Sequence, residues 1–238
     1  MMKELTLGTI QNILKEFAQN GVLFSNERQF QLELAFKLKE YYDVYLEMLD
    51  YSNGEKKYVD IVVKVGNNEF VAIELKYTTR DRNILYKTSS RTVYTFKQGA
   101  GDIRRFHFLK DVERLEKLLK KTDVFEIEGA KVIKGFAIIM TNDNYHTQTG
   151  NPEREKPTQY ARVALNEGRE IPGKIYENKP LTIDTSGYQD KKIELESSYV
   201  CKWQDYELNN TKIRIDNAVC EKDYETYPFR YMIFEISS

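Results

Sequence analysis

The sequence predicts an α/β protein in which residues 1–140 form a mixed sheet flanked by helices. Apolar positions recur at helical spacing in two N-terminal segments and one central segment, and short runs rich in β-branched and aromatic residues lie between and after them. The resulting order is helix, three strands, helix, strand. Beyond Thr141 the chain is rich in Asn, Thr, Gly, Pro and charge, so we expect residues 141–238 to be a β-rich extension packed on the core.

The composition excludes two classes of protein. The chain has 238 residues, of which 41% are hydrophobic and 13% aromatic, enough to fill a core and too many for a disordered chain. The longest apolar run, residues 135–140, has the length of a buried strand, whereas a membrane-spanning helix needs about 18 or more such residues. Lys and Arg (36) nearly balance Asp and Glu (37), so the net charge of −1 identifies no partner.

Cysteine and histidine are scarce. Cys201 and Cys220 are too few to form a disulfide framework and are not spaced as metal ligands, and whether they pair stays open. With only His107 and His146 besides, the sequence argues against a structural zinc site and against histidine-centred nucleophilic chemistry. His107 is expected to be a surface or packing residue. Residues 1–4 carry an acid and no apolar signal segment, so we expect a cytoplasmic protein whose chemistry depends on carboxylates, lysines and a hard cation.

Two helices are expected at the N-terminus. The first covers residues 5–17 and ends near residues 20–21, where Asn-Gly favours a helix stop. Ser25 is expected to cap the second helix, with Glu27 in its first turn, where the helix dipole favours an acid. Glu33 lies at the margin of the buried stripe of this helix, which consists of Phe30, Leu34, Leu38 and Tyr41.

The remaining elements follow from the same patterns. A long helix is expected over residues 102–121, with a charged exposed side at residues 113–117. The core strands are expected over residues 44–51, 58–65, 69–77 and 132–140, and the strands of the extension over residues 194–203, 211–216 and 229–236.

The second and third core strands form a hairpin that brings chemically active side chains together. Because side chains alternate along a strand, the apolar row of each strand faces one core, and the other face carries Asp60, Lys64, Glu74 and Lys76. A three-residue loop at residues 66–68 pairs Val65 with Glu69 and thereby places Asp60 directly opposite Glu74. The two apolar rows are Ile61, Val63 and Val65, and Val71, Ile73 and Leu75.

Two carboxylates in this position indicate a cation. Directly opposed like charges destabilise a strand pair by up to about 1 kcal/mol, unless a positive charge lies between them. Two carboxylates with a main-chain carbonyl or waters suit Mg²⁺, which can polarise a phosphoryl oxygen and lower the pKa of a bound water. Lys76, on the same face as Glu74, can position that water or stabilise the negative charge that develops on phosphorus oxygens.

At these residues the sequence resembles a known family. Asp60, thirteen intervening residues and then Glu74-Leu75-Lys76 resemble the signature of the PD-(D/E)XK nuclease superfamily, which has the restriction-endonuclease-like fold. The resemblance extends to the order of elements over residues 25–140. Val59 stands where the signature has proline, a position that is loosely kept in the family.

The resemblance implies an endonuclease that uses Mg²⁺ or Mn²⁺ to hydrolyse phosphodiester bonds in nucleic acid, usually DNA, in restriction, defence or mobile elements. By position, Asp60 and Glu74 would be catalytic metal ligands and Lys76 the catalytic lysine. Members often add an acid from the leading helix, for which Glu33 is the best match, and a Gln that opens the next helix, a part that Gln98 could take. Such proteins often dimerise, so a homodimer is a further expectation.

The positive charge is concentrated after the proposed catalytic strand. Residues 76–110 contain nine basic and two acidic side chains, interleaved with Tyr, Ser and Thr, whereas the other 203 residues together carry −8. Such a segment can contact phosphates through charge and hydroxyl groups with little reading of sequence. The expected nucleic-acid contacts are Arg80, Arg82, Lys87, Arg91, Gln98, Arg104 and Arg105.

Other interpretations of the same residues remain open. The charged face of the hairpin and the basic segment can be ordinary solvated surfaces, and Glu33 an ordinary surface acid. The chain can also be a non-catalytic nucleic-acid-binding protein that keeps the nuclease fold, or a hydrolase of nucleotides or other phosphoesters.

Overall fold

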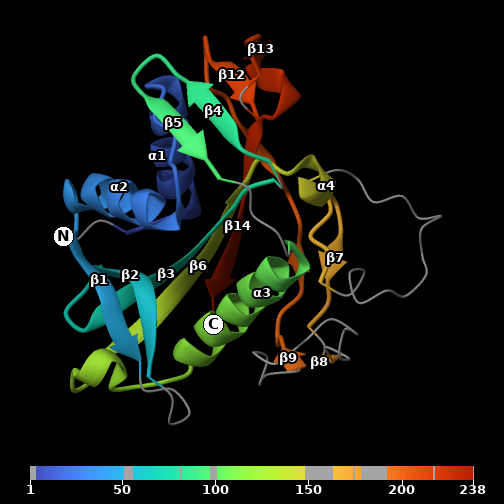
Figure 1. The fold of residues 1–238 in the computed structure, drawn as a ribbon. Helices are drawn as coiled ribbons and strands as arrows, with labels where there is room; N and C mark the ends of the chain where they lie inside the picture. The colour runs from blue at the N-terminus through green and yellow to red at the C-terminus, as the bar shows by residue number, and fades with distance from the viewer. Residues whose placement is uncertain are drawn as a thin grey trace.

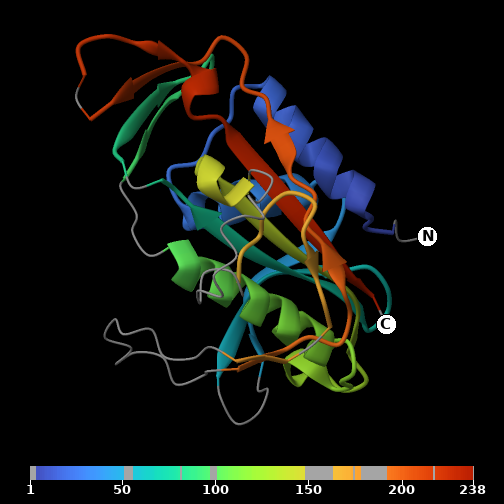
Figure 2. The same cartoon turned by 90° about the vertical axis from the view of Figure 1, so that its right-hand side faces the viewer.

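A computed structural model of the chain has a central mixed sheet of six strands with helices on both faces (Figures 1 and 2). The strand order is β1-β2-β3-β6-β14-β11, in which only the β3–β6 pair is parallel. Helices α1 and α2 cover one face and α3 covers the other. The structure describes residues 4–50, 56–80, 82–96, 101–147, 163–173, 175–177, 192–216 and 218–237.

The helices and strands lie close to the expected ranges in the first part of the chain and diverge from them later. The helices are α1 (Leu7–Gln19), α2 (Glu27–Lys39), α3 (Gly101–Leu118) and α4 (Asn144–Thr147), with 3-10 turns at Val124–Glu126 and Tyr224–Thr226. The strands are β1 (Asp43–Asp50), β2 (Lys57–Lys64), β3 (Glu69–Thr78), β4 (Ile84–Lys87), β5 (Thr92–Thr95), β6 (Lys131–Thr141), β7 (Glu170–Ile171), β8 (Ile175–Glu177), β9 (Lys192–Glu194), β10 (Tyr199–Val200), β11 (Gln204–Tyr206), β12 (Lys212–Ile215), β13 (Lys222–Asp223) and β14 (Phe229–Ser237).

The N-terminus of α2 is capped one residue later than expected. The side chain of Asn26, not of Ser25, accepts the backbone N–H of Gln29 at 2.9 Å. Ser25 contributes from outside the helix, because its N–H and hydroxyl both donate to Oε1 of Gln29. This cap fixes where the first turn begins and thus where the carboxylate of Glu27 lies.

The β2–β3 hairpin has the predicted register. Val65 N–H donates to the carbonyl of Glu69 at 2.9 Å, and Ile61 pairs with Ile73, so the loop has three residues. The pairing of Asp60 with Glu74 would be the next step in this register, but the ladder ends at Ile61 and Ile73. The two apolar rows pack with α1 and α2 as expected, whereas Ala72, in phase with Glu74, packs with α3.

Strand β2 departs from regular alternation at Asp60. Val59 packs in the core on the α3 side, although Ile61, two residues later, packs in the core on the α1–α2 side. The described pairing between β2 and β3 ends at Ile61 and Ile73, and the neighbouring strand β1 has Glu47 at φ 52°. Beyond Ile73, strand β3 therefore has no ladder partner on its β2 side.

The C-terminal part of the chain is more than an extension packed on the core. Strand β14 lies inside the main sheet, antiparallel to β6 and between β6 and β11. Strand β12 pairs with β13 on one side and, on the other, with β4 of an unexpected hairpin, β4–β5, inserted between β3 and α3; these four strands form a small sheet at the top of Figure 1. Residue 140 therefore marks no boundary in the fold, and the strand expected over residues 194–203 is replaced by the short strands β9 and β10.

Helix α3 does not have the exposed charged side that was expected at residues 113–117. Glu113 and Glu116 are only 3% and 5% exposed. The carboxylate of Glu116 accepts the backbone N–H groups of Glu196 and Ser197, both at 2.9 Å, and the hydroxyl of Tyr199 at 2.8 Å. These three hydrogen bonds fix the segment around β10 to the helix.

Glu116→Ala should therefore destabilise the protein by about 2–4 kcal/mol, because two part-buried backbone donors and one buried hydroxyl lose their acceptor. Tyr199→Phe removes only one of the three donors and should cost about 1 kcal/mol. Urea unfolding monitored by circular dichroism gives both values. Equal costs for the two variants would contradict this role of Glu116.

Two further findings concern the whole chain. Cys201 is buried and Cys220 is exposed, and both are free thiols, so no disulfide links them. Within the described ranges, no helix is both long and apolar enough to cross a lipid bilayer.

Candidate active site

The site is built on the open edge of β3. Beyond the last β2 pairing, two backbone N–H groups on this edge are bound by side-chain carboxylates instead of a strand. Oδ2 of Asp60 accepts from Leu75 N–H at 2.7 Å, and Oε2 of Glu27 accepts from Tyr77 N–H at 2.8 Å. Buried backbone donors need acceptors. Because the β2 ladder has ended, the N–H groups of Leu75 and Tyr77 take carboxylates as acceptors, and two acids therefore lie next to Lys76.

Lys76 lies between acids from both layers of helices. Its Nζ is 3.6 Å from Oε1 of Glu27 on α2 and 3.6 Å from Oδ2 of Asp111 on α3, and its side chain is 18% exposed. Burial alone would lower the pKa of Lys76, but the charges of Asp111, Glu27 and the nearby acids outweigh burial and raise the pKa above its usual value. Lys76 is therefore an ammonium group held by two ion pairs, suited to donate hydrogen bonds and unsuited to act as a base.

Glu74 is almost fully buried and forms an ion pair with an arginine. Nη2 of Arg114 lies 2.5 Å from Oε2 of Glu74, and Nη1 of Arg114 donates to the carbonyl of Tyr58 at 3.1 Å. Oε1 of Glu74 has no hydrogen-bond partner within the described part of the chain. Burial raises the pKa of Glu74 well above its usual value; Arg114 opposes this effect, and the charges of Asp111 and Asp60 add to it.

Both the backbone carbonyl and the side chain of Asp60 accept hydrogen bonds. Nε2 of Gln31 on α2 donates to the carbonyl of Asp60 at 2.8 Å, and the side chain of Asp60 binds Leu75 as described. Burial raises the pKa of Asp60 to about 6, the Leu75 N–H opposes this shift, and the charges of Asp111 and Glu27 increase it. The carboxyl group is therefore costly to ionise without an added positive charge nearby.

The cluster has an excess of negative charge. Its four acids and two cations leave a net charge of −2 when all are ionised, which a single divalent cation would neutralise; they are Glu27, Asp60, Glu74, Asp111, Lys76 and Arg114. The free Oε1 of Glu74, the carboxylate of Asp60 and the Leu75 carbonyl, which lies on the same strand edge as its own N–H, are oxygen donors suited to Mg²⁺ or Mn²⁺. No group of three or more His, Cys, Asp or Glu side chains among the described residues is already arranged to hold a metal.

Three members of this cluster were missed by sequence reasoning. Glu27 was noted only as a helix-dipole acid, and Asp111 and Arg114 were not singled out. The sequence did contain an indication of Asp111 and Arg114. Residues 104, 107, 111 and 114 follow helical spacing and line one side of α3 beside its apolar stripe. His107 belongs to this row. Burial lowers the pKa of His107; the charge of Asp111 opposes this effect and the charge of Lys76 adds to it.

Glu33, the expected helix acid, does not join the cluster. Its Oε1 is bound to Nη1 of Arg91 at 2.8 Å. Gln31 is four residues after Glu27 and faces the same way, whereas Glu33 is rotated by roughly 200° from Gln31 about the helix axis. Glu27 is therefore the acid that α2 contributes.

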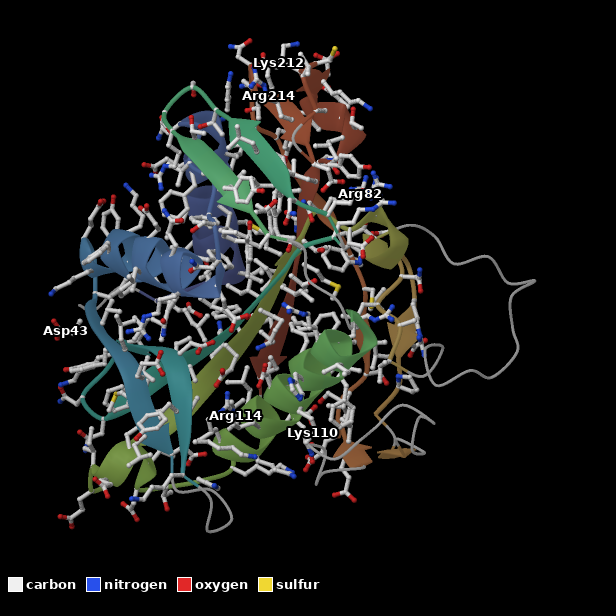
Figure 3. All side chains as sticks on the ribbon, viewed as in Figure 1. Asp43, Arg82, Lys110, Arg114, Lys212 and Arg214 are labelled. Carbon is white, nitrogen blue, oxygen red and sulfur yellow. The ribbon has the colours of Figure 1, made fainter. Side chains whose placement is uncertain are left out.

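The expected nucleic-acid contacts do not form one surface. Arg82 pairs with Asp216, Lys87 with Glu221 and Arg91 with Glu33, so acids of distant segments neutralise much of the charge. Figure 3 shows Arg82 beside the small sheet, well apart from Arg114 between α3 and β2.

The other members of that set divide in the same way. Arg80 lies over the ring of Tyr227, 5.0 Å from its centroid, and Arg105 is only 2% exposed, so Arg105 is not available to a ligand. Gln98 lies outside the described residues. Arg104, on α3, remains near the cluster; burial lowers its pKa and the charge of Glu27 opposes this.

Comparisons with known proteins add no relative to this picture. No protein-family model matches the sequence, and no curated protein or solved structure matches it significantly.

Proposed function

We propose that the protein is a nuclease that uses Mg²⁺ or Mn²⁺ to hydrolyse phosphodiester bonds in nucleic acid, with DNA as the expected polymer. The observation that carries the proposal is the gathering of Asp60, Glu74 and Lys76 around the open edge of β3. Two carboxylates and an ammonium group, with no nucleophilic cysteine nearby, suit attack by water on a phosphodiester.

The donor set fits a hard divalent ion. Asp60, the free oxygen of Glu74 and the Leu75 carbonyl would hold it, and the charges of Glu27 and Asp111 would add to the attraction for a cation. When bound, the ion would polarise a phosphoryl oxygen and lower the pKa of a bound water. The raised pKa values of the two ligand carboxyls support this fit, because an added positive charge would restore their ionised forms.

The chain itself supplies the remaining groups. Lys76 is a permanent hydrogen-bond donor that can orient the attacking water and stabilise charge developing on the phosphate. Glu27 and Asp111 hold the Lys76 ammonium from opposite sides, which fixes its position before substrate arrives. Arg104 can contact the phosphate backbone at the rim of the site.

One observation favours the alternative of a non-catalytic nucleic-acid-binding protein. Arg114 already neutralises Glu74, and no ready-made metal group exists among the residues that the structure describes. A chain that had lost catalysis could keep its fold with such an internal ion pair.

Cleavage assays separate these possibilities. Plasmid, single-stranded DNA, RNA and a small phosphodiester are incubated with Mg²⁺, Mn²⁺ or EDTA, beside a Lys76→Ala protein purified in parallel. The proposal expects metal-dependent cutting of a polymer by the wild type alone. If both proteins bind nucleic acid and neither cuts it, the alternative is supported. Turnover of only the small phosphodiester would indicate a phosphoesterase of another kind.

A further inference from the structure

Arg114 lies on the carboxylate that the proposed metal would need. Three partners hold its guanidinium: Oε2 of Glu74 at 2.5 Å, the carbonyl of Tyr58 at 3.1 Å and Oδ1 of Asp111 at 3.5 Å. The side chain is only 15% exposed. Figure 3 shows it between α3 and the β1–β2 side of the sheet.

The ion pair makes the two oxygens of Glu74 unequal. Oε2 is taken by Arg114, while Oε1 is buried without a partner in the described part of the chain. A second cation could therefore reach Glu74 only through Oε1, beside the charge of the guanidinium. This charge is permanent, because arginine does not lose its proton in proteins.

We infer that Arg114 is an internal competitor of the divalent ion, sharing its carboxylate and weakening its binding. The inference rests on the proposed metal-dependent function. With Arg114 the six charged groups of the cluster sum to −2, and without Arg114 they would sum to −3, so the guanidinium reduces the attraction on which a cation depends. A fixed unit charge near a divalent ion weakens binding by about tenfold or more, even in water-like surroundings.

A merely supportive role of Arg114 would have the opposite consequence. If the guanidinium served to hold Glu74 in a position suited to the metal, its loss would leave the carboxylate disordered and binding would weaken. The sign of the change in metal affinity therefore distinguishes competition from positioning.

The test is Mn²⁺ binding to Arg114→Gln, measured by isothermal titration calorimetry at about pH 8, far above the ordinary pKa of a carboxyl group. The amide of Gln can still donate to Glu74 without carrying charge. We expect Mn²⁺ to bind about tenfold more tightly or better than to the wild type. Unchanged or weaker binding by a folded variant would overturn the inference.

Two controls accompany this experiment. Arg230→Gln removes the same charge from β14, where Arg230 pairs with Asp205 on β11, and should leave the Mn²⁺ affinity unchanged. Circular dichroism and thermal melting establish that each variant is folded. If the Gln variant does not fold, Arg114→Met, which is also unbranched along its stem and has no polar group to satisfy, takes its place with the same expected gain.

Cleavage is scored separately on the same samples. If Mn²⁺ binds as expected but no protein cuts nucleic acid, the proposed nuclease fails and the competition by Arg114 stands. If neither the wild type nor the folded Arg114 variants bind Mn²⁺, the inference is overturned.

Discussion

Asp60→Asn should cut nucleic acid at least about 10³-fold more slowly than the wild type in the presence of metal, equivalent to about 4 kcal/mol of transition-state stabilisation. The same variant should be more stable than the wild type in metal-free buffer at neutral pH. Both effects have one cause. In the proposed site the carboxyl of Asp60 would share a cation, and without a cation its charge is buried beside Asp111 and Glu27.

The stability effect has a defined pH window. The pKa of Asp60 is about 6 in the folded protein, above the ordinary value of about 4 expected when the chain is unfolded, so the folded state binds this proton more tightly. The protonated carboxyl of Asp60 contributes its full stability to the folded state below about pH 4, and this contribution is lost as the pH rises through 6. The free energy of unfolding of the wild type therefore falls by about 2–3 kcal/mol by pH 7.5. Asn cannot ionise and escapes this loss.

Urea unfolding in EDTA at about pH 4 and about pH 7.5 measures this difference. The variant should nearly match the wild type at the lower pH and exceed its stability by about 1–3 kcal/mol at the higher pH. Added Mn²⁺ should raise the melting temperature of the wild type and leave that of the variant unchanged. A variant with the same pH dependence as the wild type would show that Asp60 is not a strained carboxylate.

Lys76→Ala should lower metal-dependent cleavage by about 10²- to 10³-fold, because the developing charge on the phosphate loses a held donor. Its metal affinity should not fall, because the change removes a positive charge from the cluster. The loss should therefore appear in the rate of single-turnover cleavage at saturating Mn²⁺ and not in the amount of metal bound.

Lys134 offers a matched control for this substitution. Its side chain is also 18% exposed and lies between two acids, Glu4 at 3.0 Å and Glu235 at 3.2 Å, but on β6 and outside the cluster. Lys134→Ala removes a comparable ion-pair network and should keep wild-type cleavage. Equal losses in both variants would mean that cleavage depends on general stability and that Lys76 has no special part.

The local features of the site could be predicted from the sequence, because they are set by neighbours in the chain. The three-residue loop at residues 66–68 fixes the register that brings Asp60 to the level of Glu74, and the apolar rows fix the face that carries Glu74 and Lys76. The break in β2 at Asp60 could not be predicted, because it depends on β1 and on the hydrogen bond from Gln31.

The distant members of the site could not be assigned in advance. Arg114 and Asp111 looked like an ordinary charged helix surface, and only the packing of α3 against β2 and β3 shows that they face Glu74 and Lys76. The choice between Glu27 and Glu33 depended on the end of the β2–β3 ladder, which leaves the Tyr77 N–H for Glu27. The place of β14 inside the main sheet likewise arises from long-range pairing that no local pattern encodes.

We propose that Asp60 and Glu74 share one divalent ion at the open edge of β3. A crystal grown with Mn²⁺, with diffraction measured at the manganese absorption edge, would locate the ion. We expect an anomalous peak bound by a carboxylate oxygen of Asp60 and by Oε1 of Glu74. Saturating Mn²⁺ with no peak between these two residues, while Arg114 still binds Glu74, would show that the two carboxylates do not share a metal.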